Sequence, residues 1–364
     1  MSLQCGIVGL PNVGKSTIFN AITRAGAQSA NYPFCTIEPN VGRVDVPDPR
    51  LYKLAELVQP KQVVPAFTEF VDIAGLVEGA SKGEGLGNKF LSHIRETQAV
   101  AHVVRCFEDE NITHVRGKIH PAEDIAIINL ELILADMESL DKQLLRLEKK
   151  ARSGEKEAKV LHELGKKIAA HLEEEKPLRT LPLSDEERTN AASFHLITGR
   201  PVLYVSNTSE EEVVSGNEGT KQVEETAEKE GTISLRICGK IEEEIAALDE
   251  EEQREYLKSI GLEEPGLHRM IRASYNLLDL ITFFTAGEPE VRAWTTPKNS
   301  LAPAAAGVIH TDIERGFIRA EVTSYEDVIA HGSLNAAKEA GKMRLEGKEY
   351  VIQDGDVCYF RFNV

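Results

Sequence analysis

The strongest constraint on this chain is a glycine-rich loop near its beginning, between an apolar run and an amphipathic run. Residues 9–17 read Gly-Leu-Pro-Asn-Val-Gly-Lys-Ser-Thr, which matches G-x-x-x-x-G-K-[ST]. The apolar residues 5–8 predict a buried strand before the loop, and the residues after it predict a helix. Such a loop wraps a triphosphate with its backbone N–H groups, so we expect Lys15 to reach the outer phosphates and Ser16 to ligate magnesium.

Length and charge limit what the chain can be. With 364 residues it exceeds one typical domain, which predicts two or three domains. Its 59 acidic and 42 basic residues give a formal net charge of −17, which excludes wrapping of nucleic acid through a global positive field. A local basic patch that contacts RNA is compatible with this composition.

Cysteine usage and hydropathy predict a soluble, cytoplasmic protein with no membrane partner. The five cysteines are scattered and lack C-x-x-C spacing, so we expect reduced thiols and no zinc site. They are Cys5, Cys35, Cys106, Cys238 and Cys358. No stretch approaches the roughly 20 apolar residues of a membrane span, and the chain begins without a basic segment leading into an apolar core.

A proline-containing loop follows the first predicted helix. Residues 31–40 contain two prolines and a polar majority, which predict an irregular segment. Thr36 lies at the distance from Lys15 at which nucleotide switches place a threonine that senses magnesium and the third phosphate.

A second switch segment begins with the alternating, β-prone residues 67–71. They predict a strand that ends in Asp72, within D-x-x-G. We expect the Asp72 carboxylate to hold magnesium through a water and the Gly75 N–H to bond the third phosphate, although Asp72 as a turn cap is the alternative. The glycine-dense residues 79–87 follow no strand, so they are no dinucleotide fingerprint, and they are suited to reorder when phosphate leaves.

Between residues 121 and 197 the pattern changes to long helices. Apolar residues recur at alternating spacings of three and four, the seam of a coiled coil. They are Leu130, Ile133, Met137, Leu140, Leu144 and Leu147, then more weakly Ala158, Leu161, Ile168 and Leu172. With a turn at Ser153-Gly154, this predicts an antiparallel helical hairpin that serves as an arm for a partner, or, as the alternative, packs on its own domain.

Strand and helix patterns alternate again after the hairpin. A buried strand at residues 99–107 precedes it, and runs at residues 201–207 and 232–237 predict two more strands. We therefore predict an α/β P-loop nucleotide-binding domain at residues 1–120 and 198–278, with the arm inserted at residues 121–197. Strand-like runs around one short helix predict a small α+β domain at residues 279–364.

The candidate base-recognition segment is Asn207-Thr208-Ser209-Glu210. Guanine-specific switches carry Asn-Lys-x-Asp there, and the aspartate takes two hydrogen bonds from the guanine edge. Glu210 is one methylene too long for that fork, and adenine has no matching pair of donors. The order of the four motifs thus indicates a GTPase-type switch that accepts adenine. Capping of the next helix is the alternative role of this segment.

With these motifs in place, the chain resembles the YchF or Obg-like ATPase family, a branch of the translation-factor GTPases that prefers ATP. The resemblance covers essentially the whole chain. It rests on residues 9–17, 31–37, 72–76 and 207–210, the inserted coiled coil, and a C-terminal part similar to TGS domains. It implies a Ras-like G domain, the inserted arm and a C-terminal β-grasp, TGS-like domain.

The resemblance also implies roles for individual residues. It implies that Ser16 and Thr36 ligate magnesium and that the backbone at Thr208 contacts the adenine. It also implies that the phosphates are bound by Asn12, Val13, Gly14, Lys15, Ser16 and Thr17. Ser234 is a further candidate base contact, but Ser234-Leu235-Arg236 departs from the Ser-Ala turn of related GTPases.

Hydrolysis requires a positioned water, and Leu76 stands where many GTPases carry the glutamine that orients it. By resemblance, His114 is the candidate for this role, and Asn12 is a candidate ligand for an activating potassium ion. The candidate catalytic residues are therefore Lys15, Gly75 and His114. A solvated or structural histidine is the alternative.

The resemblance implies hydrolysis of ATP to ADP and phosphate by a switch that associates with the ribosome or its large subunit. We expect this switch to be a monomer. A small-molecule phosphotransferase is a rival, but the sequence shows neither an acceptor site nor a dedicated base. A second rival is a non-catalytic scaffold that holds ATP while the coiled coil recruits proteins.

Overall fold

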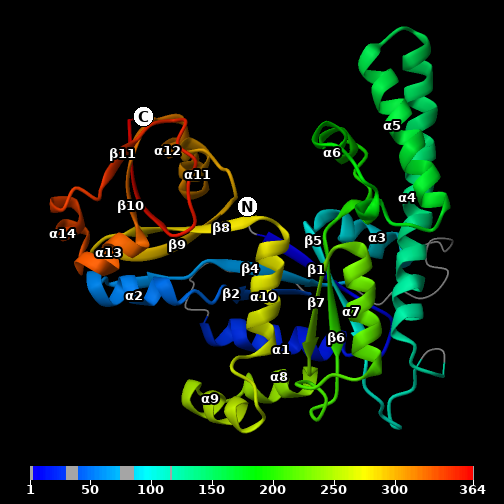
Figure 1. Cartoon of the computed structure of the whole chain (residues 1–364), viewed down its shortest axis with the longest axis horizontal. Coiled ribbons are helices and arrows are strands. Elements are labelled where there is room, and N and C mark those ends of the chain that lie inside the picture. The colour runs from blue at the N-terminus through cyan, green and yellow to red at the C-terminus, as the bar shows by residue number, and fades with distance from the viewer. Residues whose placement is uncertain (1–2, 30–39, 74–85, 115–116, 364) are drawn as a thin grey trace. The chain divides into compact units, whose positions relative to one another are not determined.

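The computed structural model describes residues 3–29, 40–73, 86–114 and 117–363, which form two compact units (Figure 1). One unit contains residues 3–44 and 69–270, and the other contains residues 45–68 and 271–364. Five predicted features lie outside the described residues: Cys35, Thr36, Gly75, Leu76 and residues 79–85.

A six-stranded sheet with the order β2-β4-β1-β5-β6-β7 organises the first unit. The strands are β1 (Leu3–Val8), β2 (Val41–Asp45), β4 (Phe67–Asp72), β5 (Ala99–Arg105), β6 (Val202–Asn207) and β7 (Ile233–Ile237). β1, β5, β6 and β7 run parallel, so their carboxyl ends and the loops that follow share one edge of the sheet. Every residue of β5 and β6 is buried, which explains their continuous apolar runs.

Helices lie between these strands and after the last of them. They are α1 (Lys15–Ser29), α3 (Leu86–Glu96), α7 (Glu218–Glu230), α8 (Gly239–Ile245), α9 (Glu250–Ser259) and α10 (Gly266–Leu277). α1 begins at Lys15, as the motif predicts, and buries Ile18 and Ile22. The start of α10 is capped by the buried carboxylate of Glu242, which accepts hydrogen bonds from the N–H groups of Gly266 (2.8 Å) and Leu267 (3.1 Å).

The inserted segment forms the predicted hairpin. α4 (Pro121–Arg152) starts with proline, whose missing N–H costs nothing in the first turn, and ends at the Ser153-Gly154 turn. α5 (Lys156–Glu173) packs alongside α4 (Figure 1). The chain then reaches β6 through η1 (Leu178–Thr180), α6 (Asp185–Ala192) and η2 (Ile197–Gly199). Near its beginning α4 packs on β5 and α7, so the hairpin is rooted on its own domain.

Most of the predicted seam forms the core of the hairpin, where Ile133 and Leu140 of α4 pack with Ile168 and Leu172 of α5. The prediction for Leu130 is wrong, because its side chain is 37% exposed. Around Leu130, the buried face of α4 is the one that packs on β5 and α7. The hairpin core with α5 begins further along the helix. The two-helix pattern also missed a third segment, because Leu178, Phe194 and Leu196 close the same core.

A buried polar cluster joins the root of the arm to the nucleotide unit. The Arg179 guanidinium, from η1, forms an ion pair with Glu230 of α7 at 2.9 Å. Arg179 also donates to Asn129 of α4 at 2.9 Å, and the Tyr204 hydroxyl of β6 donates to Glu230 at 2.9 Å. Four elements are thus held by one set of satisfied polar groups.

Asp136, in α4, fixes the return of the chain from the arm. Its buried carboxylate accepts hydrogen bonds from Ile197 N (2.8 Å), Thr198 N (2.7 Å) and Thr198 Oγ1 (2.7 Å). Asp136→Ala removes the acceptor of all three buried donors, so we expect the free energy of unfolding to fall by about 2–3 kcal/mol. Thermal unfolding followed by circular dichroism measures this. Glu138→Ala, at an exposed site on the same helix, is the control, and an equal loss in both variants would contradict the prediction.

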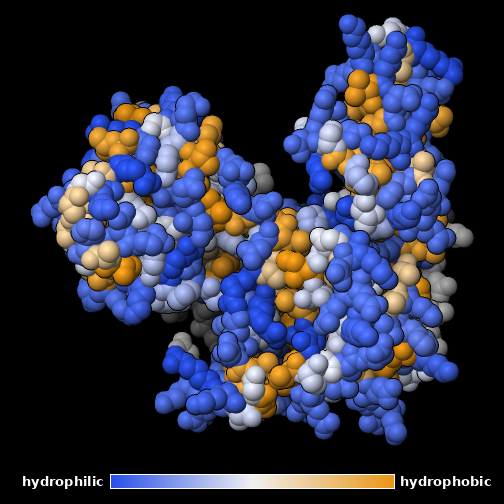
Figure 2. Space-filling view, viewed as in Figure 1, coloured by the Kyte–Doolittle hydropathy of each residue, from blue (hydrophilic) through white to orange (hydrophobic). Residues whose placement is uncertain are grey.

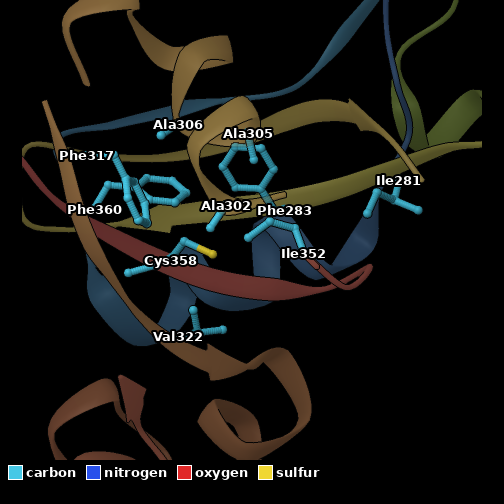
Figure 3. Close-up of a cluster of buried hydrophobic side chains, with 11 residues drawn as sticks. Ile281, Phe283, Ala302, Ala305, Ala306, Phe317, Val322, Ile352, Cys358 and Phe360 are labelled. Carbon is cyan, nitrogen blue, oxygen red and sulfur yellow. The ribbon is translucent and has the colours of Figure 1, made fainter. Parts of the chain in front are cut away.

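The second unit is built on a mixed sheet with the order β11-β10-β12-β8-β9-β3. The strands are β3 (Gln62–Val64), β8 (Leu280–Ala286), β9 (Glu290–Pro297), β10 (Phe317–Ser324), β11 (Arg344–Glu346) and β12 (Asp356–Phe362). The Phe360 ring packs on Phe283 and Phe317, with centroids 5.9 and 6.1 Å apart (Figure 3). Alanines of α11 (Ala302–Ile309) lie against these rings, because small side chains let the helix approach the sheet closely.

The prediction of one short helix in this unit is wrong. α12 (Thr311–Arg315), α13 (Tyr325–His331) and α14 (Leu334–Glu339) follow α11. Ser324 and Ser333 cap α13 and α14 by accepting hydrogen bonds from Asp327 N and Ala336 N. These helices are too short for a strong apolar period, so only the caps signal them.

Residues 45–68 pack with the C-terminal residues, although the predicted boundaries place them with the nucleotide-binding domain. They form α2 (Pro49–Val58) and β3, which pairs in parallel with β9. Arg50 of α2 forms an ion pair with Asp354 at 2.6 Å and lies over the Phe284 ring. The rest of the three-part division stays a prediction.

Within the described part of the chain, no helix combines the length and the hydropathy of a transmembrane span. The cysteines in that part, Cys5, Cys106, Cys238 and Cys358, are buried and free of disulfides.

Candidate functional site

Four loops at the carboxyl edge of the parallel strands surround a cavity of about 730 Å³. They follow β1, β5, β6 and β7, which is where open α/β sheets bind ligands. The lining residues are Asn12, Gly14, Lys15, Ser16, Thr17, Phe107, Glu108, Asp109, Ile112, Asn207, Thr208, Ser209, Glu210, Glu211, Cys238 and Lys240. The structure thus brings the P-loop and the predicted base segment into one cavity large enough for a nucleotide.

The phosphate end of the cavity is a tightly wound loop. Gly14 has a φ of +93°, and a Cβ there would lie 2.1 Å from Asn207 Nδ2, so only glycine fits. Lys15 is buried, and its ammonium donates to the carbonyls of Gly9 (3.0 Å) and Leu10 (2.9 Å). Burial lowers the pKa of Lys15, while the negative charge of Asp72 acts in the opposite direction. The ammonium is therefore held inside the loop, within the electrostatic reach of Asp72.

Two of the predicted magnesium ligands, Ser16 and Asp72, are oxygen donors near this end. Ser16 is exposed and lines the cavity, and Asp72 is the last residue of β4. Burial raises the pKa of Asp72, whereas the charge of Lys15 lowers it. A hydroxyl and a carboxylate suit a hard divalent cation.

At the base end, Asn207 joins two loops. Its Nδ2 donates to Val13 O and its Oδ1 accepts from Gly239 N, both at 2.9 Å. Because the acceptor is the main-chain carbonyl of Val13, the P-loop meets Asn207 through its backbone. Glu210 forms an ion pair with Lys240 across the cavity lining, so a lysine from the next loop holds the carboxylate.

Ser234 lies inside β7, paired with Tyr204 of β6, and does not line the cavity. Cys238 and Lys240 line it in its place, and the sequence analysis did not single them out. A signal existed, since residues just after a parallel strand lie at the ligand-binding edge and those in mid-strand do not.

Arg105, the last residue of β5, is a further residue that the sequence analysis missed. Its side chain is 1% exposed and it donates to the carbonyls of Phe107 (3.1 Å), Asp109 (3.3 Å) and Ile112 (2.9 Å). Its guanidinium also lies over the Phe107 ring, 4.6 Å from the centroid. Arg105 thus shapes the loop that forms one wall of the cavity. The sequence does contain a signal for this residue, because Arg105 is the one charged residue in the apolar run of residues 99–107.

Curated relatives match over their full length. A Bacillus subtilis protein named "Ribosome-binding ATPase YchF" is 58% identical over 366 residues, with 100% of both chains covered. The protein of the same name from Haemophilus influenzae is 57% identical over 364 residues, again with 100% of both covered. The chain belongs to the YchF family.

Family models and solved structures agree with this assignment. A model described as "50S ribosome-binding GTPase" matches residues 4–152, and a YchF C-terminal model described as a protein of unknown function matches residues 280–363. The Schizosaccharomyces pombe YchF GTPase structure has a TM-score of 0.89 at 40% identity, covering 99% of this chain and 98% of that one. A GTP binding protein from Pyrococcus horikoshii OT3 has a TM-score of 0.61 at 20% identity, with 100% of both covered, and shows the fold alone.

In this YchF-family chain, His114 lies outside the cavity lining. Its ring is buried, and Nε2 lies 3.0 Å from Asp124 Oδ2 in the first turn of α4. The residue before it is tied to the P-loop, because Asn12 Nδ2 donates to Thr113 O at 3.1 Å. In this position the His114 ring contacts α4, and its action on a water at the third phosphate stays a prediction.

Proposed function

We propose that this protein hydrolyses ATP to ADP and phosphate and associates with the ribosome. The names of its curated relatives and the P-loop cavity support this function. The printed names of the relatives disagree on the base, since some say ATPase and others GTPase or GTP binding. The choice of adenine therefore rests on the residues at the base end.

The observation that carries the choice of ATP is the position of Glu210. A guanine site needs a free carboxylate that accepts two hydrogen bonds from the base edge. Here the only side-chain carboxylate in Asn207-Thr208-Ser209-Glu210 is one methylene longer than aspartate and is paired with Lys240. A base that leaves buried polar groups unpaired is rejected steeply, so a site without the fork loses its preference for guanine.

We further propose that Ser16 and Asp72, with Thr36, hold magnesium. When bound, the ion neutralises charge on the outer phosphates. Lys15 and the backbone of residues 12–17 bind the same phosphates and stabilise charge that develops during transfer. Potassium at Asn12 also stays a proposal. The amide oxygen would be its ligand, and the hydrogen bond from Nδ2 to Thr113 O helps to orient the side chain.

The partner in this proposal is the ribosome or its large subunit, contacted by a monomer in the cytoplasm. The arm supports this role, because α4 and α5 form a long helical hairpin that presents exposed polar side chains to a partner.

Titration of ATP and GTP tests the proposal. We expect the dissociation constant for ATP to be at least tenfold lower than for GTP, a difference of about 1.4 kcal/mol. Thr208→Lys with Glu210→Asp restores the guanine-type segment and should shift the ratio toward GTP. Glu211→Asp, a matched change at the next cavity-lining carboxylate, should leave the ratio unchanged.

Equal dissociation constants for the two nucleotides in the wild type would overturn the choice of ATP. Tight ATP binding without phosphate release, with and without ribosomes, would instead favour the non-catalytic scaffold.

A further inference from the structure

The far end of the arm has a charge opposite to that of the protein. We call residues 145–160 the arm tip: the end of α4, the turn and the start of α5. It contains six basic and three acidic residues, whereas the whole chain carries −17. The basic residues are Arg146, Lys149, Lys150, Arg152, Lys156 and Lys159, and the acidic ones are Glu148, Glu155 and Glu157.

Most of these cations form no ion pair with the part of the chain that the structure describes. Arg152 pairs with Glu148 at 2.6 Å. Among the residues that the structure describes, none forms an ion pair with the other five cations, and all six cations are exposed. Glu155 and Glu157 are the remaining carboxylates of the arm tip, so its unpaired charge is positive.

The cations point away from the core of the hairpin. Arg146, Lys149 and Lys150 are spaced three and four residues apart and share one face of α4. Leu144 and Leu147, on the opposite face, pack in the hairpin core. Hydrophilic residues make up most of the surface at this end of the arm, and the exposed side chains of Leu145 (63%) and Val160 (53%) lie among them (Figure 2).

Helix stability accounts for only some of these residues. Lys149 and Lys150 lie in the last turn of α4, where the helix dipole favours cations. Lys156 is the first residue of α5 and Lys159 follows three residues later, where the dipole disfavours them. The stability of α5 therefore does not explain why lysines occupy these two positions.

The length of the arm separates this charge from the acidic body. α4 has 32 residues, which corresponds to about 48 Å. The Debye length at physiological ionic strength is about 8 Å, so the negative charge of the nucleotide unit is largely screened at the arm tip. An acidic protein can therefore present a cationic end to a polyanion.

We propose that the arm tip binds the phosphate backbone of RNA, which on the ribosome is ribosomal RNA. This inference rests on the proposed ribosome association and names the component that the arm contacts. Unpaired lysines and arginines match a row of phosphates. Protein interfaces instead centre on aromatic anchors, and residues 145–160 contain no Phe, Tyr or Trp.

Charge reversal at the arm tip tests the proposal in the full-length protein. The tip variant is Lys149→Glu, Lys150→Glu and Lys156→Glu. The control is Lys221→Glu, Lys229→Glu and Lys258→Glu, which changes the net charge equally at exposed sites on α7 and α9. Binding to purified ribosomes and to protein-free ribosomal RNA is measured by co-sedimentation and filter binding over a salt series.

We expect the tip variant to bind both at least tenfold more weakly than the control. The slope of log K against log [salt] should become less negative by about 2 to 3, one counterion for each lost phosphate contact. Hydrolysis of ATP without ribosomes should be unchanged in both variants, because none of the six lysines lines the nucleotide cavity.

Three results would overturn the inference. Equal losses in tip variant and control would show an effect of net charge alone. Unchanged affinity and slope in the tip variant would remove the arm tip from the interface. Weaker ribosome binding by the tip variant, with no wild-type binding to protein-free RNA, would assign the surface to a ribosomal protein. Failure of the wild type to sediment with ribosomes at any salt concentration would contradict the proposed function itself.

Discussion

Lys15→Ala is expected to lower the rate of ATP hydrolysis by about a thousandfold. Removal of one preorganised donor to developing charge typically costs 10²–10³ in kcat, and Lys15 also binds the ground-state phosphates. The ammonium already lies inside the P-loop, bonded to the Gly9 and Leu10 carbonyls, so no other cation can take its place without moving. Steady-state phosphate release measures the effect.

Lys240→Ala is the matched control, because Lys240 lines the same cavity at its base end. It should hydrolyse ATP within a few-fold of the wild-type rate. A Lys15→Ala variant that turns over within tenfold of wild type would refute the assignment of the P-loop lysine.

The same measurement of phosphate release compares His114→Ala with Lys15→Ala. If His114 orients the water, turnover slows while ATP affinity is retained, because such a group acts mainly on the barrier. Asp124→Asn separates this from a structural role, since it weakens the contact of 3.0 Å but keeps the imidazole. Equal slowing in both variants, with equal loss of thermal stability, would make the pair structural. Normal turnover of His114→Ala would mean that the backbone, potassium or a partner positions the attacking water.

Arg105→Met is expected to weaken ATP binding at least tenfold while leaving the binding of inorganic tripolyphosphate unchanged. The guanidinium holds three carbonyls of the loop that presents Phe107 and Ile112 to the cavity. Without it this wall of the cavity loses its shape, whereas we expect tripolyphosphate to contact only the P-loop. Isothermal titration calorimetry with both ligands measures the split.

Two variants make this result interpretable. Arg105→Lys keeps the charge but not the planar fork of donors, so its ATP affinity should be intermediate. Arg200→Met removes a half-buried arginine outside the cavity lining that donates to the backbone carbonyl of Arg95, and it should leave both affinities unchanged. A parallel loss of ATP and tripolyphosphate binding by Arg105→Met would mean that Arg105 only stabilises the fold.

The sequence by itself determined the parts of this protein whose physics is local. The P-loop needs glycine at positions of unusual φ and a helix directly behind it, and both requirements act on consecutive residues. The buried strands and the arm were likewise readable, because an apolar run or a three-and-four spacing records which face of one element is buried. Asn207 could be placed because it ends such a strand.

Tertiary structure decided the contacts between residues that are far apart in the chain. Lys240 reaches Glu210 only because β7 lies beside β6. The resulting ion pair engages the carboxylate in the base-recognition segment. Arg50 reaches Asp354, about 300 residues away, and takes residues 45–68 out of the domain that their sequence position predicts. No local pattern encodes such pairs, because their energy depends on the path of the intervening chain and not on the residues beside them.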